Sequence, residues 1–508
     1  MSRRGKLWFR VAPVLMSLAA LATPVAAADL VIALNSDPDS LDPMMGGSAV
    51  GRVVFAGFCD KLIDITTAGG FQSQLATAWT WSDDNLSLTL NLRDGVLFHD
   101  GTAMDAEAVR ANLDRYRTNP ASLRRGELSA IDNIEVIDAL TVRIVLAQPF
   151  APLVSALADR AGMMMSPTAF TESGENTGLA PVCSGPFAFV ERVAQDRIVF
   201  EKFADYWNAE NVFLDQVTYR IIPDPSLRLI NVRSGDVDIA ERISPNDIVS
   251  IEADSSIQLI EGPSIAYDQI LINTGNGPAS DNPVGSIPAV RQALSLSLDR
   301  AVINEVLYAG RFVPSIQPEL IGTAYFDERF PVTARDVDRA KALLAEAGVA
   351  NPSLTLMVSN NSTSTQLGEM IQAMSAEAGF QIKLLALEPS TWSAAAEAGE
   401  FQANIGIWSG RLDPDGNIFP WTSCKGFLNR GRWCDAENDA LLMEARQTTD
   451  PEARKALYAE AMDIYMAALP QIVLYHYKSL WAARADLKGF VPYPDGLIRL
   501  QGVSVGTN

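Results

Sequence analysis

The chain has 508 residues, of which 48% are hydrophobic and 20% charged, and its formal net charge is −21. This length provides for two or three hydrophobic cores of roughly 150 residues each, and the composition is that of an ordinary globular protein. The acidic charge favours solubility and argues against nucleic acid or an anionic membrane surface as a partner.

The N-terminus has the pattern of a secretory signal. Four basic residues precede the apolar run 11–22, namely Arg3, Arg4, Lys6 and Arg10, and the small residues 26–28 follow it. This order predicts cleavage after Ala28. Arg3-Arg4 also invites a twin-arginine interpretation, which Gly5-Lys6 matches poorly, so general secretion is favoured. No later stretch reaches the roughly 18 to 20 apolar residues that a membrane span needs, and no cysteine near the cleavage point offers a lipid anchor. We therefore expect a free periplasmic protein.

Hydrophobic periodicity predicts the elements of the first half of the chain. A strand at 30–34 leads into a loop at 35–43 that holds two prolines and three acids, and a helix follows at 50–62. Leucines alternate with polar residues over 86–92, which predicts a half-buried strand. Two glycine turns follow, with a short strand at 96–98 between them, and a helix begins near Asp105. Residues 134–137 and 142–146 form a predicted hairpin.

The second half alternates helices with strands. A strand at 267–274 enters a loop rich in Gly, Asn and Pro at 275–288, which is the best candidate for a domain crossing. Helices at 336–347, 366–378 and 391–398 each stop at a glycine, and strands at 354–358 and 380–387 separate them. This rhythm predicts a mostly parallel sheet covered by helices. Further helices are expected at 436–446 and 452–466, and a strand at 471–483.

Residues 92–109 read L-R-D-G-V-x-F-H-D-G-T-x-x-x-A-E-x-V, a run that closely resembles the extracellular solute-binding proteins of ABC transporters, in the oligopeptide, dipeptide and nickel class. Further landmarks of that family follow in its order, namely Leu75-Ala76 with Trp79, Gly185-Pro186-Phe187, Tyr206-Trp207-Asn208, Asp236-Val237-Asp238 and the helix at 290–300. The resemblance covers nearly the whole mature chain.

The resemblance implies an α/β fold of the two-lobed periplasmic binding protein type, class II or cluster C, with mixed sheets flanked by helices. It implies lobe I at residues 29–271 with an extra inserted subdomain at about 65–180, lobe II at 272–478, and a return to lobe I at 479–508. The protein would bind a small molecule or short peptide in the cleft between the lobes and deliver it, as a monomer, to an inner-membrane ABC permease.

The family's cleft segment is matched by residues 404–415. Trp408, Ser409 and Gly410 fit its pattern, but Arg411 stands where dipeptide binders carry an acid that pairs with the peptide amino terminus. An arginine fork matches a carboxylate or phosphate. Our hypothesis is therefore that Arg411 meets an anionic group of the ligand, and the alternative of equal weight is a structural ion pair with Asp413 or Asp415.

Further ligand contacts are expected from the loop at 46–48 and from Asn429. In the family the first of these segments, Gly46, Gly47 and Ser48, would line the cleft. Residues 413–417 spell D-P-D-G-N, but the positions of an EF-hand loop are not matched, so we expect a turn and no metal. We expect peptides or peptide-like compounds as ligands first, and opines, glycosides or glutathione-like anions as less favoured alternatives.

Four cysteines remain in the mature chain, an even number that suggests disulfides in an oxidising compartment. Cys424 and Cys434 flank a glycine-bearing loop, and we predict that they pair. Zinc is the weaker alternative, because there is no C-x-x-C and no nearby histidine. Cys59 and Cys183 either pair or remain buried thiols.

Other functional classes have little support. Residues 502–506 spell G-x-S-x-G, but the helix, Asp and His that a nucleophile elbow needs cannot follow so near the end. The histidines, His99 and His476, are the only ones in the chain, and a structural role is favoured for both. A nickel or haem carrier would have His476 as its only plausible soft ligand. We expect no enzyme activity and no cofactor.

Overall fold

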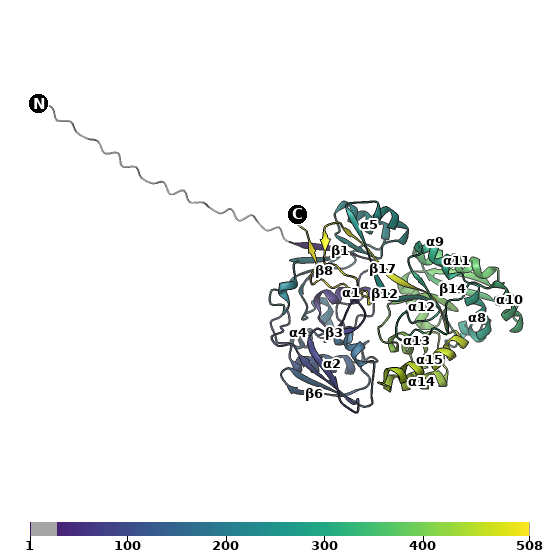
Figure 1. Ribbon diagram of the computed structural model, residues 1–508, viewed down its shortest axis with the longest axis horizontal. Helices are drawn as coiled ribbons and strands as arrows, with labels where there is room; N and C mark the ends of the chain where they lie inside the picture. The colour runs from purple at the N-terminus through teal and green to yellow at the C-terminus, as the bar shows by residue number, and fades with distance from the viewer. Residues whose placement is uncertain (2–27, 507–508) are drawn as a thin grey trace.

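The computed structural model describes Met1 and residues 28–506, so the predicted signal sequence lies almost entirely outside the described residues. Figure 1 shows two bodies of helices and strands side by side, joined in the middle by two long strands. Among the described residues, no helix combines the length and apolarity that crossing a membrane requires.

The main sheet has 11 strands and runs through both bodies. Its order is β15 (Gln381–Leu387), β14 (Ser353–Ser359), β16 (Ala403–Trp408), β12 (Ile257–Ile272), β17 (Gln471–Arg484), β11 (Ile239–Glu241), β1 (Asp29–Leu34), β10 (Gln216–Ile221), β9 (Arg197–Lys202) and β8 (Phe187–Val193), with β13 (Val313–Pro314) beside β17. Parallel pairs such as β1 with β10 occur beside antiparallel ones such as β12 with β16, so the sheet is mixed.

Strands β12 and β17 connect the two bodies. They pair antiparallel from Ile257 opposite Arg484 to Leu271 opposite Gln471, with an irregularity between Pro263 and Tyr267. One end of the pair adjoins β11 and the other adjoins β16. We call the body built on β1 and β8–β11 lobe I, and the body built on β14–β16 lobe II. The chain boundaries given above for the lobes and the subdomain remain predictions.

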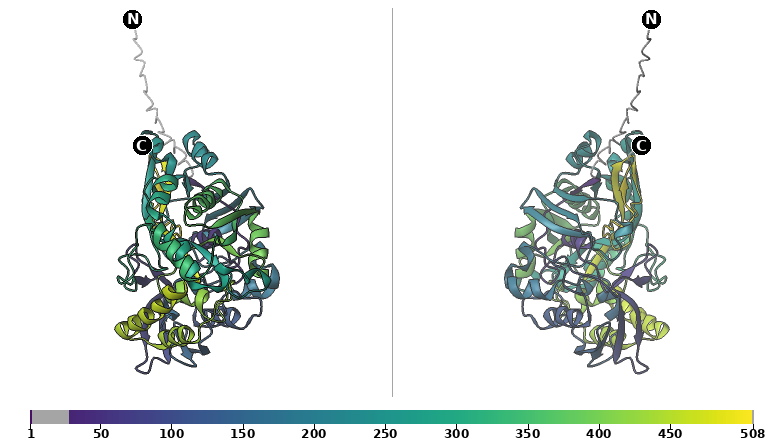
Figure 2. Two further views of the ribbon diagram at one scale, coloured as in Figure 1. Left: turned by 90° about the vertical axis from the view of Figure 1, so that its right-hand side faces the viewer. Right: turned by 90° about the vertical axis from the view of Figure 1, so that its left-hand side faces the viewer.

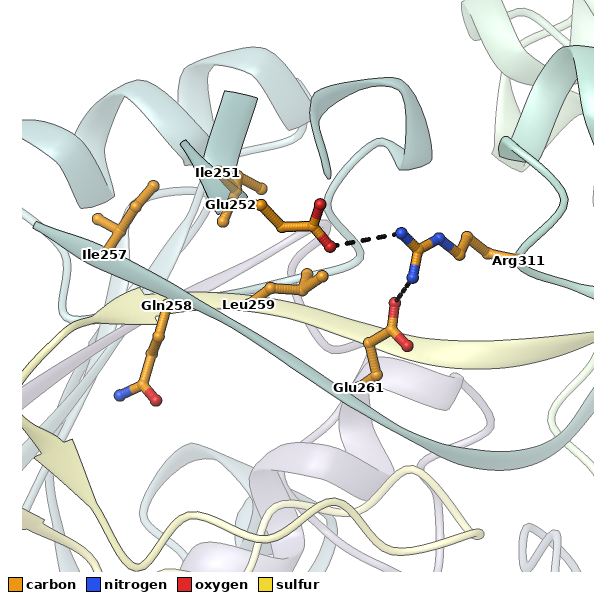
Figure 3. Close-up of a pocket in the computed structure, with 7 residues that line it drawn as sticks. All are labelled: Ile251, Glu252, Ile257, Gln258, Leu259, Glu261 and Arg311. Carbon is orange, nitrogen blue, oxygen red and sulfur yellow. Dashed lines mark hydrogen bonds and ion pairs between the residues drawn. The ribbon is translucent and has the colours of Figure 1, made fainter. Parts of the chain in front are cut away.

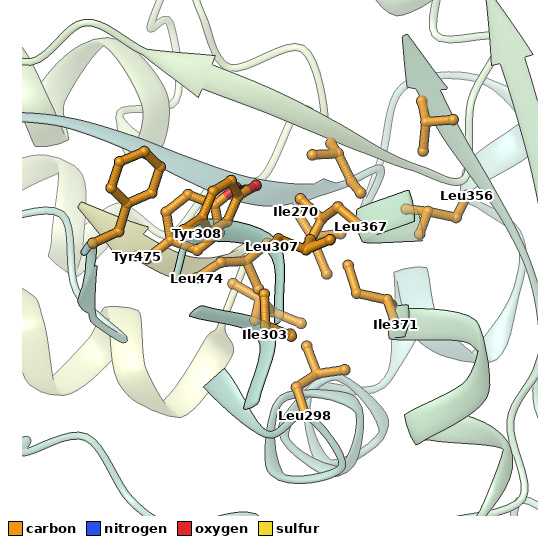
Figure 4. Packing of buried hydrophobic residues seen from close by; sticks show 14 of the residues in the cluster. Ile270, Leu298, Ile303, Leu307, Tyr308, Leu356, Leu367, Ile371, Leu474 and Tyr475 are labelled. Carbon is orange, nitrogen blue, oxygen red and sulfur yellow. Dashed lines mark hydrogen bonds between the residues drawn. The ribbon is translucent and has the colours of Figure 1, made fainter. Parts of the chain in front are cut away.

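Lobe II packs helices against its part of the sheet. Strand β14 pairs in parallel with both β15 and β16, as the alternation of helices and strands predicts. Apolar side chains of helices and strands interlock in the core shown in Figure 4, which includes Ile303, Leu367 and Leu474. The helices are α7 (Pro283–Ser286), α8 (Pro288–Leu296), α9 (Arg300–Tyr308), α10 (Val337–Glu346), α11 (Ser362–Ala376), α12 (Pro389–Ala398), α13 (Asp415–Thr422), α14 (Ala436–Gln447) and α15 (Pro451–Ala468).

Lobe I carries a second, four-stranded antiparallel sheet in the order β4 (Ala76–Trp81), β5 (Ser87–Leu92), β7 (Thr141–Leu146) and β6 (Ile131–Asp138). The predicted alternation holds in β5, where Leu88, Leu90 and Leu92 are buried against helix α2 (Ala106–Thr118) in a core of their own. In Figures 1 and 2 this sheet lies at the end of the molecule away from α5 (Pro225–Ser234).

The remaining elements of lobe I are short or flank the main sheet. They are α1 (Ala49–Phe58), β2 (Ile63–Ile65), β3 (Phe71–Ser73), α3 (Leu153–Leu157), α4 (Pro167–Ser173), α6 (Ile248–Glu252), β18 (Leu487–Lys488) and β19 (Ser504–Val505). Cys59 forms a disulfide with Cys183 in this lobe, and Cys424 forms one with Cys434 in lobe II.

Two local predictions were wrong. The strand expected at 96–98 is reduced to an isolated bridge between Leu97 and Ala103. The turn expected at 413–417 is instead the start of helix α13, with Pro414 at its N-cap and Asp415 in its first turn. Proline and aspartate are turn residues, but they are equally suited to the first positions of a helix.

Candidate functional site

Arg411 lies in the tight bend that follows strand β16. Gly410 has a φ of +71°, and a Cβ at this position would lie 2.2 Å from the carbonyl oxygen of Ile265. Only glycine fits such a bend. The bend carries the Arg411 side chain towards lobe I, and its Nη1 also donates to the Ser409 hydroxyl at 3.2 Å.

Asn417 of helix α13 holds this bend in place. Its Oδ1 accepts hydrogen bonds from the Arg411 backbone N–H at 2.7 Å and from the Trp408 indole N–H at 3.1 Å. Its Nδ2 donates to the Arg411 carbonyl at 2.8 Å and to the Glu319 carboxyl at 2.9 Å. Asn417 is 2% exposed, so one buried amide links both cleft residues to the core of lobe II.

Trp408 is partly covered by Arg411. The guanidinium lies 4.6 Å from the indole centroid, in the range of a cation–π contact. On another side the indole packs edge to face against Trp421, with ring centroids 5.5 Å apart. The predicted cleft tryptophan and the predicted cleft arginine therefore form one unit.

Arg411 reaches across to lobe I and pairs with Asp159. Its Nε lies 3.0 Å from Asp159 Oδ2, while Arg52 Nε lies 3.0 Å from Oδ1 of the same carboxylate. All three side chains are nearly buried. Burial by itself would raise the pKa of Asp159, but Arg52 and then Arg411 hold it well below its usual value. Burial lowers the pKa of Arg411 to about 10.

The alternative pairing considered for Arg411 is wrong. Asp413 pairs with Arg454 at 2.6 Å and Asp415 with Arg446 at 2.9 Å, so neither carboxylate is left for Arg411. Arg411 instead pairs with Asp159, which lies about 250 residues earlier in the chain and on the opposite lobe.

Two further arginines of lobe I, Arg124 and Arg160, meet at the Gly46 carbonyl. Arg160 Nη1 donates to this oxygen at 2.8 Å and Arg124 Nη2 at 3.4 Å. Arg160 follows Asp159 directly, and burial together with the charge of Arg124 keeps its pKa well below the usual value. Gly46, expected in the cleft, thus meets the arginines through its backbone.

Gly47 and Ser48 serve mainly to start helix α1. The Gly47 N–H donates to Asp39 at 2.7 Å, and the Ser48 hydroxyl donates to the same carboxylate at 2.6 Å while accepting from the Gly51 N–H. This is the N-cap arrangement. It places Arg52 one turn into the helix, where it reaches Asp159.

Asn429 has a structural role that the sequence did not reveal. Its amide donates to the carbonyls of Ser423 and Trp433 and accepts from the Trp433 N–H, and the residue is 2% exposed. Both amide hydrogens are used within the loop that the Cys424–Cys434 disulfide closes, so neither is free to bind a ligand.

The lobes also touch beyond the Arg411 contact. The Ala151 N–H donates to the Arg446 carbonyl at 2.8 Å, and the Arg446 guanidinium lies 4.9 Å from the Phe150 ring. The lobe interface therefore extends beyond the Arg411–Asp159 pair.

Four charged residues of this interface were missed from sequence: Arg52, Arg124, Asp159 and Arg160. A signal was present for three of them. Arg52 stands within the run A-V-G-R-V-V-F, and Asp159-Arg160 within A-L-A-D-R-A-G-M-M-M. Charged residues are seldom fully buried unless they are paired, so a charge inside an apolar run indicates a buried partner or a ligand.

His476 is buried and His99 is partly buried, and a ring nitrogen of each lies within hydrogen-bond distance of a backbone carbonyl. His99 Nε2 lies 3.0 Å from the Gly185 carbonyl and His476 Nε2 lies 3.0 Å from the Pro318 carbonyl. Burial lowers the pKa of each to about 4. Within residues 28–506 there is no group of three or more His, Cys, Asp or Glu side chains that could hold a metal ion.

A groove of about 500 Å³ lies elsewhere, beside the start of β12. In Figure 3 Arg311, which follows α9, extends over the strand towards Glu252 and Glu261. It pairs with Glu261 at 2.8 Å and Glu252 at 3.4 Å. None of the predicted site residues lines this groove.

Residues 70–429 match the family model described as bacterial extracellular solute-binding proteins, family 5. The glutathione-binding protein GsiB of Pectobacterium atrosepticum is 31% identical over 96% of each chain, and GsiB of Escherichia coli K12 is 30% identical over 97% of each chain.

Solved structures share the fold. The Agrobacterium tumefaciens protein AgaA, in complex with agropinic acid, has a TM-score of 0.83 and 25% identity and covers 94% of this chain and 99% of its own. The murein tripeptide binding protein MppA of Escherichia coli has a TM-score of 0.84 at 23% identity, covering 95% of this chain and 99% of its own. The predicted α/β periplasmic binding protein fold is confirmed.

Proposed function

Because the chain belongs to the bacterial extracellular solute-binding proteins of family 5, we propose that it captures a short anionic peptide-like solute between its lobes. As a solute-binding component of an ABC importer it binds its ligand without altering it, since proteins of this family are non-catalytic. In our proposal it acts in the periplasm as a monomer and hands the ligand to an inner-membrane permease.

The observation that carries the proposal is the position of Arg411. The residue lies between the lobes, beside Trp408, at the place where dipeptide binders of the family carry an acid. An acid there suits a ligand ammonium, whereas a guanidinium suits a carboxylate through two parallel hydrogen bonds. The ligand is therefore oriented by a carboxylate at this position.

Glutathione is the leading specific ligand class. The name of the relatives at 30–31% identity states that they bind it, and glutathione is a short peptide with two carboxylates and one ammonium group. Its negative net charge agrees with an arginine in the cleft segment. Other anionic peptide-like solutes, including opines, share this chemistry.

In this proposal the ligand is captured because its binding favours closure of the two lobes. A ligand shifts the balance between open and closed forms only by contacts that it makes better in the closed form. Arg411 and the lobe I arginines meet only when the lobes touch, so a carboxylate held between them is such a contact. Strands β12 and β17 are the connection about which the lobes move in this proposal.

The test is native mass spectrometry of protein purified from the periplasm, followed by calorimetry. The calorimetric panel contains reduced and oxidised glutathione, alanyl-alanine and nickel–histidine. We expect an anionic peptide to co-purify and glutathione to bind more tightly than alanyl-alanine. The R411A variant should lose most of this affinity, while R339A, which alters an exposed ion pair with Glu346, should keep it. Unchanged affinity in R411A would contradict the proposed orientation.

A further inference from the structure

Four guanidinium groups crowd together at the lobe interface with too little negative charge to balance them. Arg52 and Arg411 share Asp159, and Arg124 and Arg160 share the Gly46 carbonyl. Glu127 pairs with Arg124 at 2.7 Å, and the carboxylate of Asp495, whose charge also acts on Arg52, pairs with Arg499 at 2.9 Å. The cluster therefore has two positive charges in excess, in a chain whose net charge is −21.

These positive charges are buried. Arg52, Arg124 and Arg160 are each at most 4% exposed, and the Arg411 side chain is 13% exposed. A buried charge without an opposite charge to balance it is strongly unfavourable. Burial and the neighbouring charge of Arg124 lower the pKa of Arg160 well below its usual value.

Two N–H groups in the cluster also lack acceptors among the described residues. A guanidinium has five N–H donors, yet the Nε atoms of Arg124 and Arg160 are buried without a partner in the described part of the chain. Within residues 28–506, the side chain of Arg160 donates from Nη1 alone, to the Gly46 carbonyl. Buried donors are almost always satisfied in folded proteins, so these donors indicate an acceptor that comes from outside the chain.

A comparison with Arg228 makes the contrast clear. Arg228 is also buried in lobe I, at 3% exposure, but it donates to four backbone carbonyls, which are those of Ile222, Pro223, Glu241 and Arg242. That arginine is structural, because its donors are satisfied by the fold. At the lobe interface, by contrast, the Nε donors of Arg124 and Arg160 have no acceptor among the described residues.

We infer that Arg52, Arg124 and Arg160 form an anion subsite on lobe I that receives a second carboxylate of the ligand, so that the protein selects doubly anionic peptide-like solutes. This inference rests on the proposed function and deepens it. One carboxylate is held by Arg411 on lobe II, and the other enters beside Gly46. A ligand with two carboxylates supplies the two negative charges that the cluster lacks.

The first test compares variants in calorimetry with reduced glutathione and with glutathione monoethyl ester, which lacks one carboxylate. R124Q and R160Q should each lower the affinity for glutathione at least tenfold. The ester should bind the wild type at least tenfold more weakly than glutathione, and R160Q should discriminate less between the two. R228Q should keep the wild-type affinity.

Thermal unfolding separates a binding role from a structural one. Removal of one guanidinium from a repelling cluster should leave the melting temperature of ligand-free R160Q equal to or above that of the wild type. R228Q loses satisfied hydrogen bonds and should melt lower. A melting temperature in R160Q as low as in R228Q, or glutathione affinity within twofold of wild type in both R124Q and R160Q, would overturn the inference.

A second probe keeps the inference separate from the identity of the ligand. Sulfate, compared with chloride at equal ionic strength, should raise the melting temperature of the wild type and of R228Q more than that of R160Q. If glutathione does not bind the wild type but sulfate shows this difference, glutathione is not the ligand, and the result still supports the anion subsite. If sulfate stabilises all three proteins equally, the subsite is wrong.

Discussion

Arg411 of lobe II and Asp159 of lobe I form an ion pair across the lobe interface, with 3.0 Å between Nε and Oδ2. Asp159 simultaneously pairs with Arg52, so a single carboxylate connects the contact between the lobes to the body of lobe I. In our proposal a ligand carboxylate binds beside this internal one. Asp159 places one carboxylate oxygen against Arg411 and the other against Arg52.

Replacement of Asp159 by Asn should destabilise the ligand-free protein strongly. The change leaves buried guanidinium groups without their carboxylate, and the loss of one partner of a buried pair costs about 3 to 5 kcal/mol. Urea unfolding at pH 7 measures the free energy of unfolding. D463N is the control, because Asp463 pairs with Arg329 where both side chains are 52% exposed, and it should cost under about 1 kcal/mol. Equal losses in the two variants would contradict the account.

Asn417 is expected to act as a positioning residue for ligand binding. N417A removes the amide that holds both the Arg411 backbone and the Trp408 indole. We expect the affinity for the anionic ligand to fall about tenfold or more, equivalent to about 1.4 kcal/mol. Asn438 is a matched control, since it is also fully buried in lobe II and donates to the Thr422 carbonyl. N438A should lower stability but leave the calorimetric affinity unchanged, whereas a normal affinity in N417A would remove the positioning role.

Glu319 should make stability depend on pH. Burial raises the pKa of Glu319 to about 7, from a usual value of 4.5. Between these values the folded chain retains a proton that the unfolded chain has lost, so the free energy of unfolding falls as the pH rises from about 4.5 to 7.

The E319Q variant isolates this effect. Glutamine carries no titrating proton and can still accept from the Asn417 amide. The stability of E319Q relative to wild type should therefore rise across this window, by up to roughly 3 kcal/mol. Urea unfolding at pH 4.5, 5.5 and 7 checks it, and a difference that does not change with pH would show that Glu319 is not held protonated.

The Cys424–Cys434 disulfide should stabilise the protein without shaping the anion site. The bridge closes a loop of 10 residues, and the double variant C424A/C434A should lose about 3 kcal/mol by the loop-entropy model. Affinity should stay within about twofold of wild type, because none of the four interface arginines lies in the loop. A tenfold loss of affinity would place this loop in the binding site.

Much of the fold could be predicted from local patterns. The alternation of Leu88, Leu90 and Leu92 with polar residues placed them on the buried face of β5. Gly348, with a φ of +68°, ends the segment of helix α10 as expected. Residues 413–417 were misjudged because Pro and Asp suit both a turn and a helix start, and only packing decides between them.

Only some of the site residues could be predicted from the sequence. Trp408 and Arg411 could be selected because they stand in a recognisable segment, but their partners could not. Arg52 and Asp159 are 107 residues apart and their pairing depends on how helix α1 packs in lobe I. The role of Asn429 was equally hidden, since an amide that closes its own loop looks in sequence like any exposed loop asparagine.

Small-angle X-ray scattering with and without the anionic peptide identified by mass spectrometry tests the central claim most directly. The account predicts that saturating ligand lowers the radius of gyration of the wild type as the lobes close, and that R411A shows little of this change at the same concentration. A radius of gyration that stays the same in the wild type while calorimetry shows the ligand bound would contradict capture between the lobes.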